Sequence, residues 1–274
     1  MVFPLLRSND LREWERAGRA LLRPEHSLGP NFWAPEVAFS EGRFWLYYSV
    51  GFGDKQHQLR VGSSGTPLGP YQDRDRPLTE LSSCPFAIDA HPFRDEDGQW
   101  YLFYARDFLD SDKGVRPGTA LKVASMKSMT ELKDEGVVVL RAQHDWQRFE
   151  VDRIMYGARY DWHTLEGPFV RKHDGRYYCF YSAGRWEDET YGVDYAVADN
   201  VLGPYSSEGN EGGPRVLRTV PGELVGPGHN SIISAPNGDD FIVYHAWDAQ
   251  MTARRMFIDR LVWTSEGPRC ERWL

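Results

Sequence analysis

Four residues that could do chemistry stand at the same place in four copies of one sequence pattern: Trp33, Asp89, Glu166 and His229. Each lies nine residues before a glycine that opens an aromatic-rich segment. Carboxylates and an imidazole can transfer protons, and an indole can stack against a flat apolar ligand. If a repeated fold places equivalent residues around a common axis, these four side chains gather in one pocket.

The elements that must position these residues are short strands. Each glycine is followed by an aromatic strand-like run, for example Tyr-Tyr-Cys-Phe-Tyr at 177–181. A further strand-like run follows in three of the copies, over 58–64, 120–125 and 193–198. Aromatic and β-branched runs bounded by Gly, Pro, Asn and Asp are typical of strands. We therefore predict that each copy is a four-stranded antiparallel meander.

Radial repetition of such meanders builds a β-propeller. Four copies have their first strands, whereas residues 3–11 and 13–16 resemble only the outer two strands of a fifth. The sequence therefore predicts an all-β fold. We expect one domain over residues 1–274, a five-bladed β-propeller whose first blade is incomplete.

Composition narrows the class of ligand. The chain has 274 residues and a net charge of −8, which disfavours nucleic acid and anionic membranes as partners and permits a neutral ligand. Aromatic residues make up 14% of the chain, and we expect some of them to line a binding surface.

The cysteines and the hydropathy pattern indicate the compartment. Three scattered cysteines do not suggest a disulfide framework or a zinc site. The sequence has no apolar run of 18 residues, and its first residues lack the pattern of a signal peptide. We expect a cytoplasmic protein from the sequence as it stands, and a secreted one if a leader has been removed.

Four segments, in order along the chain, resemble the signature strands of glycoside hydrolase family 43: 32–37, 88–93, 165–169 and 226–231. The closing stretch over 243–263 is similar too. Each motif alone is weak, but four in order at a matching distance from a glycine turn are specific. The resemblance implies a five-bladed β-propeller and an inverting glycosidase that acts on arabinose- and xylose-containing glycans.

The resemblance also implies roles for the residues that match the family's motifs. Glu166 matches the general acid, and Asp89 matches the carboxylate that tunes the pKa of the acid and orients it. Trp33 matches an aromatic residue of the sugar pocket. His229 matches a central imidazole that supports a bound calcium ion or a water cluster, and no organic cofactor is implied.

Glycoside hydrolysis needs a proton on the leaving oxygen and a nucleophile at the anomeric carbon. An unperturbed glutamic acid is ionised at neutral pH, so Glu166 must be kept protonated, which burial and a neighbouring carboxylate both favour. We expect Asp89 to supply that like charge. Inverting enzymes hold the acid and the base roughly 6.5–9.5 Å apart, which leaves room for a water molecule.

The general base of the family belongs to an Asp-Pro motif on the first blade, and we expect that motif to lie upstream of Met1. Glu36, three residues after Trp33, is a substitute that could reach the water. A carboxylate from another chain and an unassisted water are the alternatives.

Three further residues are candidates for binding substrate. His91 lies two residues after Asp89, and strand alternation places both on one face. Arg254 and Arg255 follow the last long loop, and we expect one of them to reach the pocket, with a structural salt bridge as the alternative. Likewise, His229 could be an ordinary core histidine.

The sequence therefore predicts an exo-acting glycosidase with an oligosaccharide substrate, either an α-L-arabinofuranosidase or a β-xylosidase. An endo-arabinanase with an open cleft is one alternative. A carbohydrate-binding propeller without catalytic activity is the other.

Overall fold

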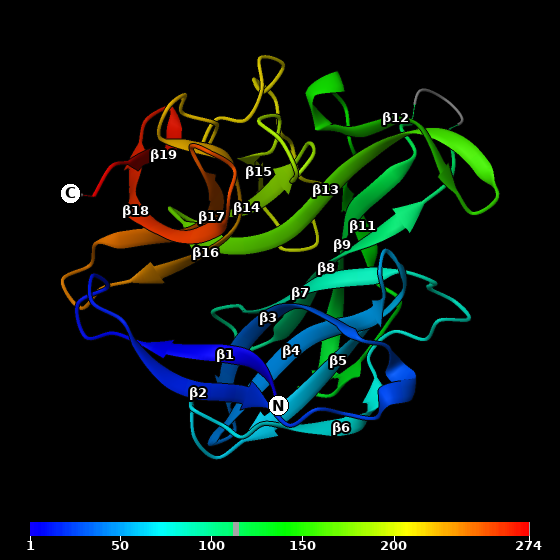
Figure 1. The fold of residues 1–274 in the computed structure, drawn as a ribbon, viewed down its shortest axis with the longest axis vertical. Helices are drawn as coiled ribbons and strands as arrows, with labels where there is room; N and C mark the ends of the chain where they lie inside the picture. Colours follow the sequence, from blue (N-terminus) through cyan, green and yellow to red (C-terminus); the bar gives the residue numbers. More distant parts are fainter. Residues whose placement is uncertain (112–114, 274) are drawn as a thin grey trace. The chain divides into compact units, whose positions relative to one another are not determined.

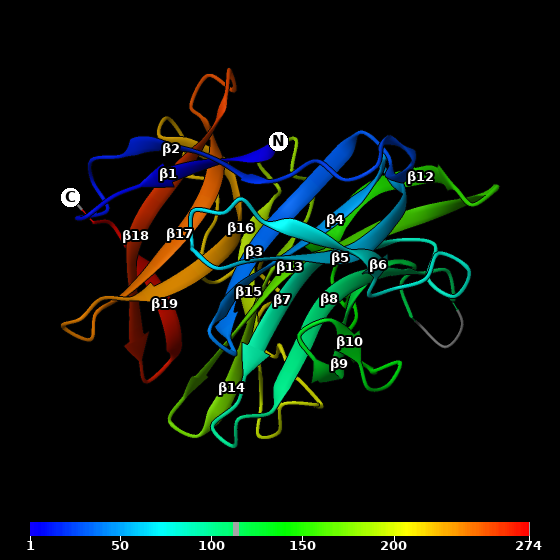
Figure 2. The ribbon, with the colours of Figure 1, turned by 90° about the horizontal axis from the view of Figure 1, so that it is seen from below.

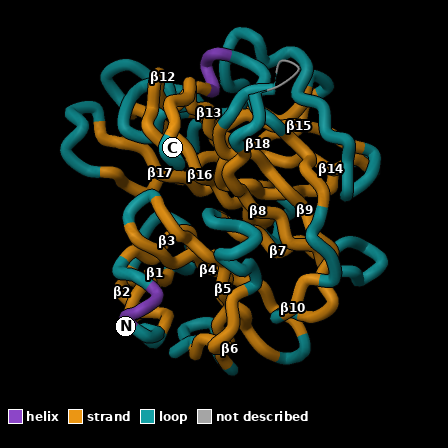
Figure 3. Tube along the Cα trace, turned by 90° about the vertical axis from the view of Figure 1, so that its right-hand side faces the viewer, coloured by secondary structure: helices purple, strands orange, loops and turns teal. Residues whose placement is uncertain are grey.

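The computed structural model describes residues 1–111 and 115–273. The described residues form strands, loops and two single-turn 3-10 helices, η1 (His26–Leu28) and η3 (Asp145–Gln147), and Figure 3 shows how strongly strand dominates. Within the described residues, no helix has the length and apolar character needed to cross a bilayer. The predicted all-β class is confirmed.

The contacts within the chain divide it into two compact units, and each is described by itself. The first unit comprises residues 1–106 and 123–137, and the second comprises residues 107–122 and 138–274. Strands β8 (Trp100–Phe108) and β9 (Gly118–Ser128) each begin in one unit and end in the other.

The first unit holds three groups of strands (Figure 1). The hairpin of β1 and β2 corresponds to the two strands expected near the N-terminus, and β3 to β6 form a four-stranded antiparallel meander in chain order. The third group contains β7, β8 and the later part of β9 with β10. Apart from β8 and β9, the strands of this unit are β1 (Val2–Arg7), β2 (Glu15–Leu21), β3 (Asn31–Ser40), β4 (Arg43–Phe52), β5 (Lys55–Ser64), β6 (Gln72–Pro77), β7 (Ala87–Arg94) and β10 (Glu131–Leu132).

The second unit contains another four-stranded meander, formed by β16 to β19, which Figure 2 shows in orange to red. It also contains the antiparallel run β13, β14 and β15, and β12 pairs with the start of β13. The strands are β11 (Val137–Leu140), β12 (Arg148–Met155), β13 (Ala158–His173), β14 (Arg176–Ala183), β15 (Gly192–Ala198), β16 (Leu224–Ser234), β17 (Asp240–Asp248), β18 (Arg254–Thr264) and β19 (Gly267–Glu271).

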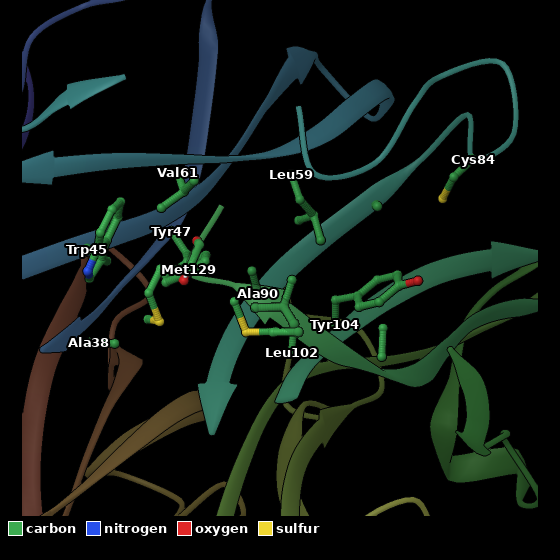
Figure 4. Packing of buried hydrophobic residues seen from close by; sticks show 13 residues of the cluster. Ala38, Trp45, Tyr47, Leu59, Val61, Cys84, Ala90, Leu102, Tyr104 and Met129 are labelled. Carbon is green, nitrogen blue, oxygen red and sulfur yellow. Dashed lines mark hydrogen bonds between the residues drawn. The ribbon is translucent and has the colours of Figure 1, made fainter. Parts of the chain in front are cut away.

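Strand β4 shows why the aromatic runs form central strands. Its side chains alternate between two apolar clusters of the first unit, because successive residues of a strand point to opposite faces. Trp45 and Tyr47 join one cluster, and Leu46 and Tyr48 join the other. Figure 4 shows the first cluster, in which Trp45 and Tyr47 pack with Leu59. A strand buried on both faces needs the unbroken apolar run that the sequence carries.

The core of the second unit is built in the same way. Phe180 on β14 and Ile242 and Tyr244 on β17 are buried together, with Leu261 from β18. Each fully buried side chain of this size contributes about 1.5–3 kcal/mol relative to an exposed one. Packing of the aromatic runs therefore holds the hairpins that carry the chemically interesting residues.

The first strand of each of the four hairpins contains a β-bulge, in which two residues lie opposite one. In each of these strands one bulge lies opposite a single tyrosine, namely Tyr48, Tyr104, Tyr181 or Tyr244, and β16 has a second bulge opposite Ala246. The first residue of each bulge has a positive φ: Ala34 (48°), Asp89 (61°), Gly167 (57°) and His229 (51°). The bulge is thus the repeated structural feature.

This register shows that the four residues found by counting back from the glycines are not all structurally equivalent. Asp89 and His229 occupy the first bulge position, but Trp33 and Glu166 each lie one residue before it. Counted from the backbone pairs that close them, the turns after β7 and β16 have three residues, whereas the turns after β3 and β13 have two, so counting back nine residues mixes two positions. Trp33 and Glu166 remain equivalent to each other.

Three of the four tyrosines donate a hydrogen bond to a buried aspartate that also pairs with an arginine. Tyr181 is one of them, and its hydroxyl lies 2.9 Å from the carboxylate of Asp194. Asp194 is fully buried and also accepts from Asn210 at 2.8 Å and from Arg215 at 2.7 Å. The other two pairs are Tyr48 with Asp73 and Tyr244 with Asp259. These networks fix the strand opposite each bulge.

Replacement of Asp194 by alanine is expected to destabilise the protein by about 3–5 kcal/mol, because it leaves a largely buried guanidinium without its carboxylate. The shift in the midpoint of urea unfolding measures this loss. Asp199→Ala on the same hairpin is the control, since the Asp199–Arg176 pair is exposed and such pairs contribute about 0–1 kcal/mol. Similar midpoints for the two variants would contradict a structural role of the network.

Candidate functional site

Trp33, in the first unit, lies against an imidazole. Its ring stacks on the ring of His57, with 3.9 Å between centroids and 22° between planes. Burial lowers the pKa of His57 to about 4, so this histidine is neutral at pH 7. Its Nε2–H donates to the carbonyl of Gly53 at 2.8 Å, which fixes the ring. The indole is half-buried, so it can also offer a flat apolar surface to a ligand.

Glu36 and His91 form a pair within the first unit. The Nδ1 atom of His91 lies 3.2 Å from a carboxylate oxygen of Glu36. The imidazole is buried, with 6% of its side chain exposed, whereas 23% of the Glu36 side chain is exposed. A carboxylate held by a fixed imidazole on one side and open on the other has a defined orientation, which a general base requires.

Asp89 lies in the bulge of β7 and is buried, with 6% exposed. A non-glycine residue at a positive φ is uncommon, and such backbone strain clusters at functional sites. The bulge also invalidates the alternation argument for His91. Two residues, Asp89 and Ala90, lie opposite Tyr104, so the period of two is interrupted between Asp89 and His91.

Glu166, in the second unit, has a specific hydrogen-bond donor. The hydroxyl of Tyr191 lies 2.5 Å from Oε1 of Glu166. Glu166 is half-buried and pairs with Ser182 on β14, next to the bulge of β13. A carboxyl group at a bulge, half-buried and held by a tyrosine, can exchange a proton with a ligand while its orientation is kept.

Tyr191 reaches Glu166 because residue 228 is a glycine. A Cβ atom at Gly228 would lie 1.8 Å from Cε1 of Tyr191, so no other residue fits without moving the ring. The ring is also nearly parallel to that of His245, with 6.0 Å between centroids and 13° between planes. The sequence analysis missed Tyr191, and the signal that points to it is the glycine immediately before His229.

His229 is held by its backbone and by contacts of its ring. Its N–H donates to the hydroxyl of Ser182 at 2.7 Å. A Cβ atom at Gly167 would lie 3.2 Å from the imidazole, so the two bulges of β13 and β16 touch through this glycine. The His229 ring lies 6.4 Å from that of His245. Burial, then the nearby His229 and Arg254, lower the pKa of His245 to about 3.

The two arginines on β18 have different partners. Arg255 pairs with Asp248 at 3.3 Å, which is the structural salt bridge given as the alternative. The guanidinium of Arg254 instead lies over aromatic rings, 4.5 Å from the centroid of Trp186 and 5.8 Å from that of Trp247. Neither tryptophan was singled out by the sequence as a site residue.

A calcium ion at His229 would need oxygen donors around the imidazole. The described residues contain no group of three or more His, Cys, Asp or Glu side chains placed to hold a metal ion. Calcium takes six to eight oxygen ligands, and an imidazole supplies none. Among the described residues, such side chains alone do not complete a calcium site, and a calcium ion at His229 stays a prediction.

Solved structures resemble the chain over nearly all of its length. A thermostable family-43 glycoside hydrolase is 30% identical, with a TM-score of 0.81, and the match covers 98% of this chain and 84% of that one. The α-L-arabinanase of Cellvibrio cellulosa is 25% identical, with a TM-score of 0.77, covering 98% and 88%.

Curated relatives include hydrolases of several furanosides. The β-D-galactofuranosidase of Aspergillus niger is 29% identical over 86% of this chain, and the chain spans 63% of the length of that relative. The extracellular endo-α-(1→5)-L-arabinanase 1 of Bacillus subtilis is 27% identical over 96% of this chain and 78% of its own length. The family model described as "Glycosyl hydrolases family 43" matches residues 2–268. This match spans nearly the whole chain, and the chain belongs to glycosyl hydrolase family 43.

Proposed function

We propose that the chain is an exo-acting, inverting glycosidase that removes arabinofuranose or xylose from oligosaccharides. Glu166 carries the proposal, because the residue at the family's acid motif has a dedicated hydrogen-bond donor at 2.5 Å. The names of the relatives support the substrate class, since they include an exo-α-(1→5)-L-arabinofuranosidase of Cellvibrio japonicus that is 27% identical over 95% of this chain.

In the proposed mechanism, the carboxyl group of Glu166 protonates the glycosidic oxygen as the bond to the anomeric carbon breaks. The Tyr191 hydroxyl keeps the carboxyl in one orientation and stabilises the carboxylate that forms when the proton leaves. Asp89 has the role of raising the affinity of Glu166 for its proton, as the family resemblance implies. Trp33 provides the flat surface on which the sugar ring packs.

Inversion needs a water molecule activated on the opposite side of the sugar ring. We assign this role to Glu36, because His91 orients its carboxylate and part of the side chain stays exposed. The proposal includes the five-bladed propeller with an incomplete first blade, in which radial repetition places bulged strands around an axis.

An endo-acting arabinanase is the second candidate, and the match to the B. subtilis enzyme over 96% of this chain favours it. The products released from linear arabinan distinguish the two modes, since an exo enzyme releases one size of product from the first minutes.

The relatives from B. subtilis and C. japonicus are both named as extracellular enzymes, which supports the secreted interpretation over the cytoplasmic one.

Replacement of Glu166 by glutamine is expected to lower kcat on arabino- or xylo-disaccharides by about 10²–10⁴-fold, because the leaving oxygen then departs without its proton. Hydrolysis of the matching glycosyl fluoride should fall far less, since fluoride needs little protonation to leave. Equal losses on both substrates, or no loss on either, would show that Glu166 is not the general acid.

Replacement of Glu36 by glutamine is expected to slow both substrates, unlike replacement of Glu166. A base acts on the attacking water whatever group departs, so hydrolysis of the disaccharide and of the fluoride should both fall by about 10²–10⁴-fold. Circular dichroism and the unfolding midpoint check that the fold persists without the Glu36–His91 pair. A folded E36Q variant with wild-type rates would remove Glu36 from the mechanism.

Replacement of Tyr191 by phenylalanine is expected to move the basic limb of the kcat/KM–pH profile upward by about one pH unit. A hydrogen bond to a carboxylate favours its ionised form, so its loss raises the pKa of Glu166. Tyr195→Phe is the control, because the Tyr195 hydroxyl donates to the backbone carbonyl of Glu266. An unmoved limb in Y191F would mean that Tyr191 only packs against its neighbours.

A further inference from the structure

Trp186, Trp247 and Arg254 form a cluster that the proposed mechanism does not use. The two indole rings are nearly parallel, with 6.3 Å between centroids and 16° between planes. The indole N–H of Trp247 donates to the backbone carbonyl of Trp186 at 3.0 Å, which fixes one ring against the other. The guanidinium of Arg254 lies over both rings, and Arg254 pairs directly with Trp247 across β17 and β18.

The cluster adjoins the donor to Glu166 within the second unit. Trp186 and Tyr191 belong to one loop, the segment between β14 and β15. Their stacking partners, Trp247 and His245, lie two residues apart on β17, so their side chains share one face of the strand. The two stacked pairs are therefore consecutive layers, about 6.6–6.8 Å apart along β17.

The Arg254 guanidinium has unused hydrogen-bonding capacity. Arg254 is exposed, and within residues 1–111 and 115–273 its side chain makes no ion pair and no hydrogen bond, whereas its neighbour Arg255 has Asp248. A guanidinium that lies over indole rings is restrained by them, and its five N–H donors point outward from the edges of its plane. Such a plane suits pairs of hydroxyl groups on one sugar ring.

We propose that this tryptophan–arginine cluster binds the sugar residue on the leaving-group side of the bond that is cleaved. The inference rests on the proposed function, because Glu166 defines that side: the general acid protonates the leaving oxygen, and Tyr191 links the acid to the cluster. Arg254 donates to two hydroxyls of the leaving sugar, and the indole faces left uncovered pack against its C–H groups.

The experiment measures kcat/KM of three enzyme forms on two substrates. The enzyme forms are the wild type, Arg254→Gln and Trp247→Phe. A glycosyl fluoride places no sugar on the leaving-group side, whereas an arabino- or xylo-oligosaccharide does. Both variants are expected to lose roughly tenfold or more in kcat/KM on the oligosaccharide, because charge-assisted hydrogen bonds and stacking are removed. Their kcat/KM on the fluoride should stay within about twofold of wild type, well under the tenfold loss expected of a lost contact.

Arg260→Gln is the matched control, since Arg260 lies on the same strand and pairs with the exposed Asp239. It should leave both substrates unaffected. Equal losses on the fluoride and the oligosaccharide would overturn the proposal, because they would indicate a distorted acid site. Unchanged kinetics of R254Q on both substrates would overturn it as well. Failure of the proposed function is recognised separately, by wild-type rates of Glu166→Gln on the oligosaccharide.

Discussion

The bulge opposite a tyrosine is the constraint on which the rest of the structure depends. In a regular strand, successive side chains point to opposite faces of the sheet. Such a strand cannot place two neighbouring residues opposite a single residue of its partner, as a bulge does. In four hairpins one extra residue enters the strand, and the tyrosine opposite it stays in register. In three of these hairpins, the tyrosine is held by a buried aspartate. The candidate site residues lie in the bulge or beside it, and the rigidity of the bulge comes from the other strand.

The cost of this arrangement is carried by the backbone. Asp89 and His229 adopt a positive φ, which costs a non-glycine residue of order 1–3 kcal/mol when the surroundings must impose it. At the equivalent place in β13 the bulge residue is Gly167, which adopts this conformation without strain, and the proposed catalytic carboxylate, Glu166, lies one residue earlier. The same backbone device thus presents different residues at two adjacent positions.

Sequence reasoning recovered the strands because their signal is local. Buried central strands need unbroken aromatic runs, and these runs stand in the sequence at 43–48, 100–104 and 177–181. The position of Glu166 relative to Asp89 could not be counted correctly, because hairpin turns of different length shift the register by one residue. Only the pairing of each strand with its partner reveals where the extra residue lies.

The residues missed by the sequence are those whose role arises from contact between distant segments. Tyr191 stands in a loop without periodicity, and its function depends on a glycine 37 positions away, at 228, that leaves space for its ring. Trp186 directly precedes the acidic run at 187–189, and it stacks on Trp247 from β17. Loops escape local patterns because their conformation is set by what they pack against. A glycine that precedes a candidate histidine therefore marks the place where a distant side chain must enter, and in this chain that side chain holds the proposed acid.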